Sequence, residues 1–298
     1  MSPAIRTQAL EKRFRRTVAL GGVDLQVAEG SIYALVGPNG AGKTTAIKLL
    51  MNILRPTAGR SEVLSTDSRR LAPADFARIG YVSENQEMPE WMTVAYFLEF
   101  LRPFYPAWDD ALAADLVRQF DLPADRKLKN LSRGMRMKAS LASSLAYRPK
   151  LIVLDEPFTG LDALVRDELI QGLLARAEGT TIFISSHDLA EIESFASHIG
   201  YLDEGKLRFS EELESLRARF HEVVLTFEAP QSLPPGLPAD WLQPETSGSV
   251  VRFIDSQFHP ERTPAAVRQL FPDVRDISPS GMPLRSIFVA LAKASRHA

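Results

Sequence analysis

The stretch Gly37–Thr45, read GPNGAGKTT, constrains this chain more than any other segment. The apolar run Ile32–Val36 precedes it and predicts a buried strand, and Ala46–Met51 follows it with the pattern of a helix. A glycine-rich loop between a strand and a helix is the setting in which G-x-x-x-x-G-K-[ST] binds phosphate. The positions that match this pattern are Gly37, Gly42, Lys43 and Thr44.

The residue types in this loop suit a chain of phosphates. Glycines let the backbone curl so that successive N–H groups point inward, and the start of the following helix adds positive charge. Lys43 can reach the β- and γ-phosphates, the Thr44 hydroxyl can ligate Mg²⁺, and Thr45 would lie near the α-phosphate. The alternative is a plain glycine turn, whereas a dinucleotide fold is disfavoured because the spacing is not G-x-G-x-x-G. The predicted loop residues are Gly37, Pro38, Asn39, Gly40, Ala41, Gly42, Lys43, Thr44 and Thr45.

Composition narrows the class of protein. The 298 residues, 45% of them hydrophobic, have room for about two domains. Lys+Arg of 35 against Asp+Glu of 37 leaves no basic excess, so we expect no nucleic-acid partner. The chain has no cysteine, which excludes disulfides and thiolate metal sites. No stretch approaches about 18 uninterrupted apolar residues and no export signal is visible, so we expect any membrane role to come through a partner chain.

Two later apolar runs end in residues that carry chemistry. Leu151–Leu154 leads into Asp155 and Glu156, and Thr180–Ile184 is followed closely by His187. An aspartate at the carboxyl end of a buried strand can hold Mg²⁺, and the neighbouring glutamate can orient or deprotonate a water molecule. His187, on the same edge of the sheet, can donate to a γ-phosphate. Alone, each has an ordinary reading as a solvated acid or a surface histidine.

Two further segments are candidates for ligand contact. The predicted strand Ile79–Val82 leads into the polar loop Ser83–Glu90, and the sequence NLSRGM at Asn130–Met135 begins a helix. Ser132 can cap that helix, or the helix start can form a second anion site. The small Gly134 would let a ligand approach the backbone closely.

The remaining pattern predicts two domains, at residues 1–220 and 221–298. In the first, strands at Ile5–Leu10 and Val23–Val27 flank a basic turn at Glu11–Arg16, where Phe14 either stacks on a base or belongs to the core. An inserted helical subdomain at about 86–148 carries aromatic residues that form its own core or a docking face. Other predicted elements are helices at 93–104, 108–120, 163–177, 189–197 and 210–220, a hairpin at 199–209, strands at 222–227 and 250–254, and helices at 263–271 and 283–293.

The ordered motifs GPNGAGKTT, LSRGM, LIVLDEP, TGLD and SSH resemble the ATP-binding subunit of an ATP-binding-cassette (ABC) transporter over about residues 1–220, and the tail is similar to the bacterial ABC-2-type exporter group. The resemblance implies an α/β fold: a P-loop NTPase ABC cassette with a mostly parallel core sheet, an antiparallel β subdomain, an inserted helical subdomain and a small C-terminal α+β appendage. It implies an ATPase that uses ATP and Mg²⁺ and powers transport, with export expected, through a separate transmembrane permease at the cytoplasmic face of the cell membrane.

The resemblance also implies residue roles. Two cassettes, identical or different, would pair head to tail with ATP between the phosphate loop of one and LSRGM of the other. Phe14 would stack on adenine, Lys43 and Thr44 would hold phosphate and Mg²⁺, and Asp155 would support the metal. Glu156 would be the catalytic base and His187 would contact the γ-phosphate. Ser132 and Gly134 would reach across to the partner's ATP, and Asp162 would bridge the two sites.

The chain departs from the family pattern in two places. Glu84 stands where the family usually has a glutamine that contacts Mg²⁺ or water, and Gln86 lies two residues further on. A carboxylate can coordinate Mg²⁺ but cannot donate a hydrogen bond. Arg133 and Met135 replace the commoner glycine and glutamine of the signature. These departures leave open the alternative of a regulatory module with little hydrolysis. A separate alternative is an ABC ATPase that moves no solute, although such proteins usually carry two cassettes or long insertions, which this chain does not show.

Overall fold

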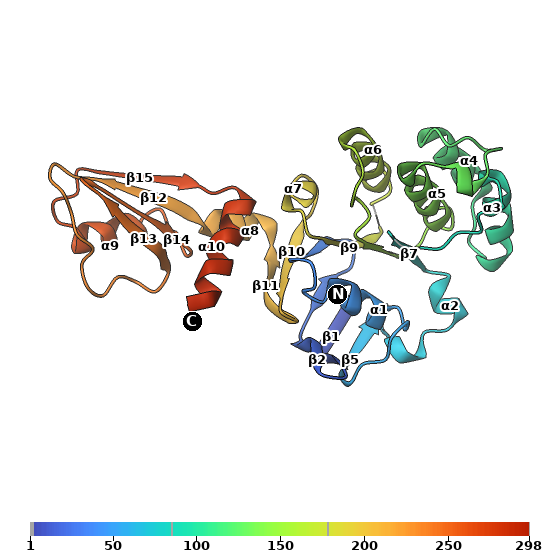
Figure 1. Ribbon diagram of the computed structural model, residues 1–298, viewed down its shortest axis with the longest axis horizontal. Coiled ribbons are helices and arrows are strands. Elements are labelled where there is room, and N and C mark those ends of the chain that lie inside the picture. Colours follow the sequence, from blue (N-terminus) through green and yellow to red (C-terminus); the bar gives the residue numbers. More distant parts are fainter. Residues whose placement is uncertain (1–2, 85, 178, 298) are drawn as a thin grey trace. The chain divides into compact units, whose positions relative to one another are not determined.

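The computed structural model describes residues 3–84, 86–177 and 179–297. These residues form two compact units, Met1–Ser210 and Glu211–Ala298 (Figure 1). The predicted boundary lies ten residues later, so the predicted closing helix of the first domain, observed as α8 (Leu213–Arg219), falls in the second unit. Four residues of the predicted domains, Met1, Ser2, Glu178 and Ala298, and Asn85 of the predicted polar loop lie outside the described residues.

A six-stranded sheet forms the centre of the first unit, in the order β11-β10-β4-β9-β8-β7. Strands β10, β4, β9, β8 and β7 run parallel, and their apolar runs are largely buried because helices cover both faces. Parallel strands place their carboxyl ends at one edge, where the predicted site residues gather. The strands are β4 (Ile32–Val36), β7 (Ile79–Ser83), β8 (Leu151–Asp155), β9 (Thr181–Ser186), β10 (His198–Asp203) and β11 (Lys206–Glu212).

A second, antiparallel sheet corrects one prediction. The basic segment Glu11–Arg16 is not a turn: β1 continues through Phe14 and pairs with β2, with Phe14 opposite Thr17. Charged side chains did not end the strand because they occupy its exposed end, and the turn is confined to Arg15 and Arg16. The strands of this sheet are β1 (Pro3–Phe14), β2 (Thr17–Val23), β3 (Gln26–Ala28), β5 (Ala58–Val63) and β6 (Thr66–Asp67).

Figure 1 shows helices α3 to α6 on one side of the six-stranded sheet and α1 with the antiparallel sheet on the other. The predicted helix 93–104 changes to 3-10 geometry at Arg102–Phe104, where Pro103 lies, and the predicted helix 189–197 ends at Ile192. Among the described residues, no helix is both long and apolar enough to cross a membrane. The helices are α1 (Lys43–Leu50), α2 (Pro73–Phe76), α3 (Val94–Leu101), α4 (Asp110–Gln119), α5 (Arg133–Leu145), α6 (Ala163–Leu174) and α7 (Leu189–Ile192).

The second unit contains an antiparallel sheet in the order β13-β14-β12-β15, packed on its own aromatic core. The sequence analysis did not predict the two edge strands, because Pro244 and Pro279 interrupt their strand pattern. A sheet accepts proline at its edge, where the missing N–H leaves no partner strand without a donor. Its elements after α8 are β12 (His221–Thr226), β13 (Trp241–Ser247), β14 (Val250–Asp255), α9 (Arg262–Leu270), β15 (Asp276–Gly281) and α10 (Leu284–His297).

Candidate active site

The glycine-rich loop connects β4 to α1, as the sequence predicts. Two of its glycines are required by close approach of other backbone atoms. A Cβ at Gly37 would lie 2.0 Å from the carbonyl oxygen of Leu202, and one at Gly42, which has φ +108°, would lie 2.5 Å from that of Ala19. Any larger residue would therefore push the loop away from its place against β2 and β10.

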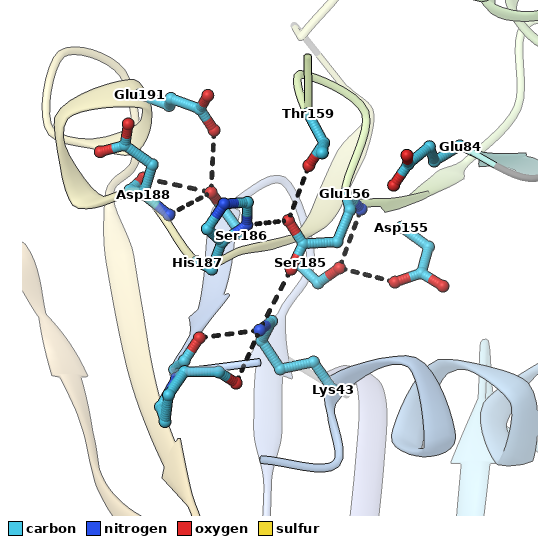
Figure 2. A network of polar contacts seen from close by, with 12 residues as sticks. Lys43, Glu84, Asp155, Glu156, Thr159, Ser185, Ser186, His187, Asp188 and Glu191 are labelled. Atoms are coloured by element: carbon cyan, nitrogen blue, oxygen red, sulfur yellow. Dashed lines mark hydrogen bonds and ion pairs between the residues drawn. The ribbon is translucent and has the colours of Figure 1, made fainter. Parts of the chain in front are cut away.

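Lys43 is 5% exposed and folds back over the loop. Its Nζ donates to the carbonyl oxygens of Gly37 at 2.7 Å and Pro38 at 3.2 Å, and it lies 3.1 Å from Glu156 Oε1 (Figure 2). The buried ammonium is therefore paired with the carboxylate that the sequence nominated as catalytic base.

Asp155 ends β8 and is 3% exposed. Its Oδ1 accepts hydrogen bonds from Ser185 Oγ at 2.8 Å and Thr44 Oγ1 at 3.0 Å. Burial raises the pKa of Asp155, and the two hydroxyls oppose that shift. Sequence reasoning missed Ser185. It lies one strand over, opposite Asp155 in the parallel register, and its place in the SSH motif was the only sequence signal.

Glu156 is held from several sides in the network of Figure 2. Its Oε2 lies 2.7 Å from His187 Nδ1 and accepts from Thr159 Oγ1 at 3.2 Å, while its backbone N–H donates to Ser185 Oγ at 3.0 Å. Its φ of +52° is uncommon for a side chain with a Cβ. Burial alone would raise the pKa of Glu156, but the bond to His187 and the charge of Lys43 outweigh it, and the pKa is lowered.

A second polar network lies behind His187. Ser186 Oγ bonds to Glu191 Oε2 at 2.9 Å and accepts from the N–H of Asp188 at 3.0 Å. Glu191 is 6% exposed, burial raises its pKa, and Arg166 of α6 lies 3.3 Å away. These contacts fix the turn that carries His187 at the edge of the sheet.

A cavity of about 420 Å³ opens between these elements. Of the residues that line it, Thr17, Val18, Ala19 and Thr159 were not predicted. Thr17, Val18 and Ala19 begin β2, which pairs with β1. A prediction that extended β1 through Phe14 would have placed them in a strand next to the phosphate loop. Phe14 itself does not line the cavity; it is 43% exposed, with Lys12 Nζ 4.9 Å from its ring centre. The lining residues are Thr17, Val18, Ala19, Asn39, Gly40, Gly42, Lys43, Thr44, Thr45, Glu84, Glu156, Thr159 and His187.

The polar loop that follows β7 and contains Glu84 and Gln86, named the coupling loop below, contributes Glu84 to this cavity. Its backbone N–H donates to the carbonyl oxygen of Asp155 at 3.2 Å, and its side chain forms an ion pair with Arg133. Gln86 does not line this cavity and accepts a hydrogen bond from Ser140 of α5 at 2.9 Å. Glu84 therefore faces the phosphate loop in this structure.

The remaining predicted residues do not line the cavity of their own chain. Ser132 caps α5 by accepting from the N–H of Met135 at 3.2 Å, and Asp162 caps α6 by accepting from that of Val165 at 3.0 Å. A Cβ at Gly134 would lie 2.8 Å from Val165 Cγ1, so close packing of α5 on α6 requires the glycine. Their roles toward a nucleotide stay predictions.

The fold and this site define a phosphate-loop nucleotide-binding protein of the α/β class. A family model described as "ABC transporter" matches residues 20–159. The chain is 39% identical over 209 residues, 68% of its length and 65% of the relative's, to "Daunorubicin resistance ATP-binding protein DrrA2" of Streptomyces coeruleorubidus. It is 31% identical to "Daunorubicin/doxorubicin resistance ATP-binding protein DrrA" of Streptomyces peucetius, with 97% of this chain and 92% of the relative covered.

Solved structures show the same fold. A dimeric ATP-binding cassette in a post-hydrolysis state with ADP and phosphate matches with a TM-score of 0.62 at 23% identity, covering 70% of this chain and 98% of that one. The chain belongs to the ABC transporter family and is one of its ATP-binding subunits, with an ATPase cassette. This confirms the predicted family and fold class.

Proposed function

We propose that this subunit hydrolyses ATP in the cavity at the carboxyl edge of the six-stranded sheet and thereby drives export through a separate permease. One observation carries the proposal: Glu156 lies between the phosphate-loop lysine, 3.1 Å away, and His187, 2.7 Å away. A carboxylate in that position can accept the proton of a water molecule that attacks the γ-phosphate.

The ion pair between Lys43 and Glu156 keeps the proposed catalytic base weakly basic before ATP binds. The hydrogen bond to His187 and the charge of Lys43 together lower the pKa of Glu156, so in this arrangement the carboxylate is a weak base. When triphosphate enters the loop, Lys43 turns to its oxygens and leaves Glu156, whose basicity then increases. His187 retains Glu156 through Nδ1 and uses its other ring nitrogen toward the γ-phosphate.

The residues present suit Mg²⁺. Thr44 Oγ1 and Asp155 Oδ1 are 3.0 Å apart, whereas the Glu84 carboxylate is paired with Arg133. Hydroxyl and carboxylate oxygens are the donors that Mg²⁺ prefers, with phosphate oxygens and water completing its shell. Thr44 and Asp155 would hold the ion, which would neutralise charge on the phosphates. No group of three His, Cys, Asp or Glu side chains among the described residues is arranged to hold a metal without such additional ligands.

A second cassette completes the site in this proposal. Ser132, Gly134 and Asp162 lie outside the cavity of their own chain, and the similar cassette bound to ADP and phosphate is a dimer. The two helix starts that these residues occupy can present N–H groups to a nucleotide held by another copy, identical or different.

An apolar cavity of about 500 Å³ beside the coupling loop is the surface that we assign to the permease. Ile53, 53% exposed, and Phe100, 43% exposed, border it together with Gln86. Exposed apolar side chains around a cavity favour the binding of an apolar segment of a membrane-embedded partner. Docking there would place the subunit at the inner membrane surface. Export as the direction is supported by relatives named for drug resistance.

Phosphate release from ATP tests the proposal. Glu156→Gln should lower turnover by about 10²- to 10⁴-fold, the usual contribution of a positioned acid–base group, while binding of ATP persists. Asp255→Asn is the matched control, because that buried carboxylate lies in the second unit and does not line the cavity, and it should retain turnover. Unchanged hydrolysis in Glu156→Gln would remove the assigned base. Wild-type protein that binds ATP but does not turn it over, alone or with its permease, would favour the regulatory alternative.

A further inference from the structure

The two departures from the family pattern contact each other. Arg133, at the start of α5, forms an ion pair with Glu84 of the coupling loop. On the way it passes over Gly160, whose φ is +70°; a Cβ there would lie 2.7 Å from Arg133 Nη1. Arg133 thus connects three segments that are far apart in the sequence, because it belongs to α5 and contacts both the coupling loop and the loop before Asp162.

The position of Glu84 makes this contact matter for nucleotide binding. Glu84 lines the cavity that contains the phosphate loop, and its backbone N–H is bonded to the carbonyl of Asp155. With Asp155 and Glu156 it is the third carboxylate at this edge of the sheet, where the lysines are Lys43 and Lys48. A triphosphate entering the cavity would meet the repulsion of an unpaired Glu84.

We propose that Arg133 is a positioning residue that neutralises Glu84 and holds it away from the entering phosphates, so that the two substitutions act as one unit. The proposal rests on the proposed function, because it assigns the cavity to ATP. The alternative is an ordinary surface ion pair, whose loss changes nothing measurable. A second alternative is that Arg133 acts on the nucleotide of a partner cassette independently of Glu84.

A double-mutant cycle separates these possibilities. The measured quantity is the Kd of a nonhydrolysable ATP analogue with Mg²⁺, for the wild type, Glu84→Gln, Arg133→Ala and the double variant. Arg133→Ala should weaken binding by about fivefold, and Glu84→Gln alone should change it by less than about twofold. The double variant should return to within about twofold of the wild type, because removing the carboxylate removes the need for the arginine.

Three controls make the cycle specific. Arg133→Lys keeps the charge and should bind like the wild type. Arg148→Ala breaks another exposed ion pair, with Asp109 at 2.8 Å, and should leave the Kd unchanged. High salt should shrink the defect of Arg133→Ala, since the cause is charge repulsion rather than altered folding.

The outcomes are distinguishable. Wild-type protein that does not bind the analogue, or binds it equally after Lys43→Ala, would overturn the proposed function. If the wild type binds through Lys43 but Arg133→Ala binds equally well, Arg133 and Glu84 are only a surface pair. A double variant as weak as Arg133→Ala would mean that Arg133 acts without Glu84, and it too would overturn the inference.

Discussion

Asp155 in the first unit and Asp255 in the second occupy the same local position, the last residue of a strand, and each is 3% exposed. Asp255 accepts from Thr263 Oγ1 at 2.6 Å and from the N–H of Gln257 at 2.9 Å, and none of the cavities described above borders it. Asp155 is also bonded to hydroxyls, but its neighbours include a second carboxylate that is paired with a lysine.

The comparison shows that a buried aspartate at the end of a strand is not by itself a sign of catalysis. Asp255 joins β14 to the start of α9 through Thr263, which is a structural connection within the second unit. Asp155 becomes a metal candidate because Thr44 lies 3.0 Å from it and because a cavity opens beside both. The surrounding charges, rather than the burial of the carboxylate, distinguish the two.

The largest expected effect comes from removing each carboxylate in turn. Asp155→Ala should lower ATP turnover by about a hundredfold or more, since charge stabilisation by the metal is worth several kcal/mol. Asp255→Ala should leave turnover within about twofold of the wild type and lower stability by about 1–3 kcal/mol, because the buried hydroxyl of Thr263 and the N–H of Gln257 lose their acceptor. Turnover assays and denaturant unfolding measure both. Equal losses of turnover in two folded variants would break the comparison.

The hydroxyl groups that donate to the two aspartates provide a finer test of the comparison between Asp155 and Asp255. Ser185→Ala removes the donor to Asp155 and the acceptor for the N–H of Glu156, so we expect about a tenfold loss of turnover, as is common when a catalytic group loses an outer contact. Thr263→Val removes the donor to Asp255 and should reduce stability alone, by about 1–3 kcal/mol. If Ser185→Ala lowers stability but leaves turnover unchanged, the hydroxyls of Ser185 and Thr263 have the same structural role.

Asp155 also predicts a dependence of stability on pH. Because burial raises its pKa in the folded state, its ionised form costs stability, and that cost appears as the pH rises through the interval from its unfolded value, about 4, to the raised value. Asp155→Asn should therefore unfold a few degrees higher than the wild type near pH 7.

Acidification provides the check on this effect. The difference in unfolding temperature, measured without Mg²⁺, should shrink as the pH falls through the raised pKa of Asp155. The lowered pKa of Glu156 acts in the opposite sense, since its stabilisation is lost on acidification, and the charge of Glu156 contributes to the raised pKa of Asp155. The two proteins are therefore also compared in a Glu156→Gln background, in which that contribution is absent. A difference that grows toward low pH would contradict the assignment.

Local pattern was sufficient for much of the fold and for the nomination of the site. The continuous runs Ile32–Val36 and Leu151–Leu154 predicted buried strands, and the resemblance to the ABC family implied that the core strands run parallel. Parallel strands bring their carboxyl ends together, so the position of Asp155 near the phosphate loop followed from topology. Edge strands were missed where Pro244 and Pro279 interrupt the pattern, since a sheet tolerates proline only where no partner needs the N–H.

Contacts between distant segments could not be predicted in the same way. The sequence marked Glu84 and Arg133 as separate departures, but their pairing depends on how α5 and the loop after β7 fold toward each other. Ser185 directly follows the predicted strand Thr180–Ile184 and was given no role, because its bonds to Asp155 and Glu156 depend on the register between β8 and β9. Both depend on tertiary geometry that one-dimensional periodicity does not contain.

The smallest effect is expected for Thr159→Val, because Glu156 has more hydrogen-bond and ion-pair partners than Asp255. Glu156 is held by Lys43 and His187 as well as by Thr159, whereas Asp255 relies on Thr263 for its side-chain donor. Thr159→Val should therefore lower ATP turnover by no more than about threefold and stability by less than about 1 kcal/mol, because the stronger, charge-assisted contacts remain. Steady-state kcat and thermal unfolding measure this, with Thr263→Val as the counterpart that should be the less stable of the two. A tenfold loss of turnover in Thr159→Val would instead make Thr159 the residue that orients Glu156.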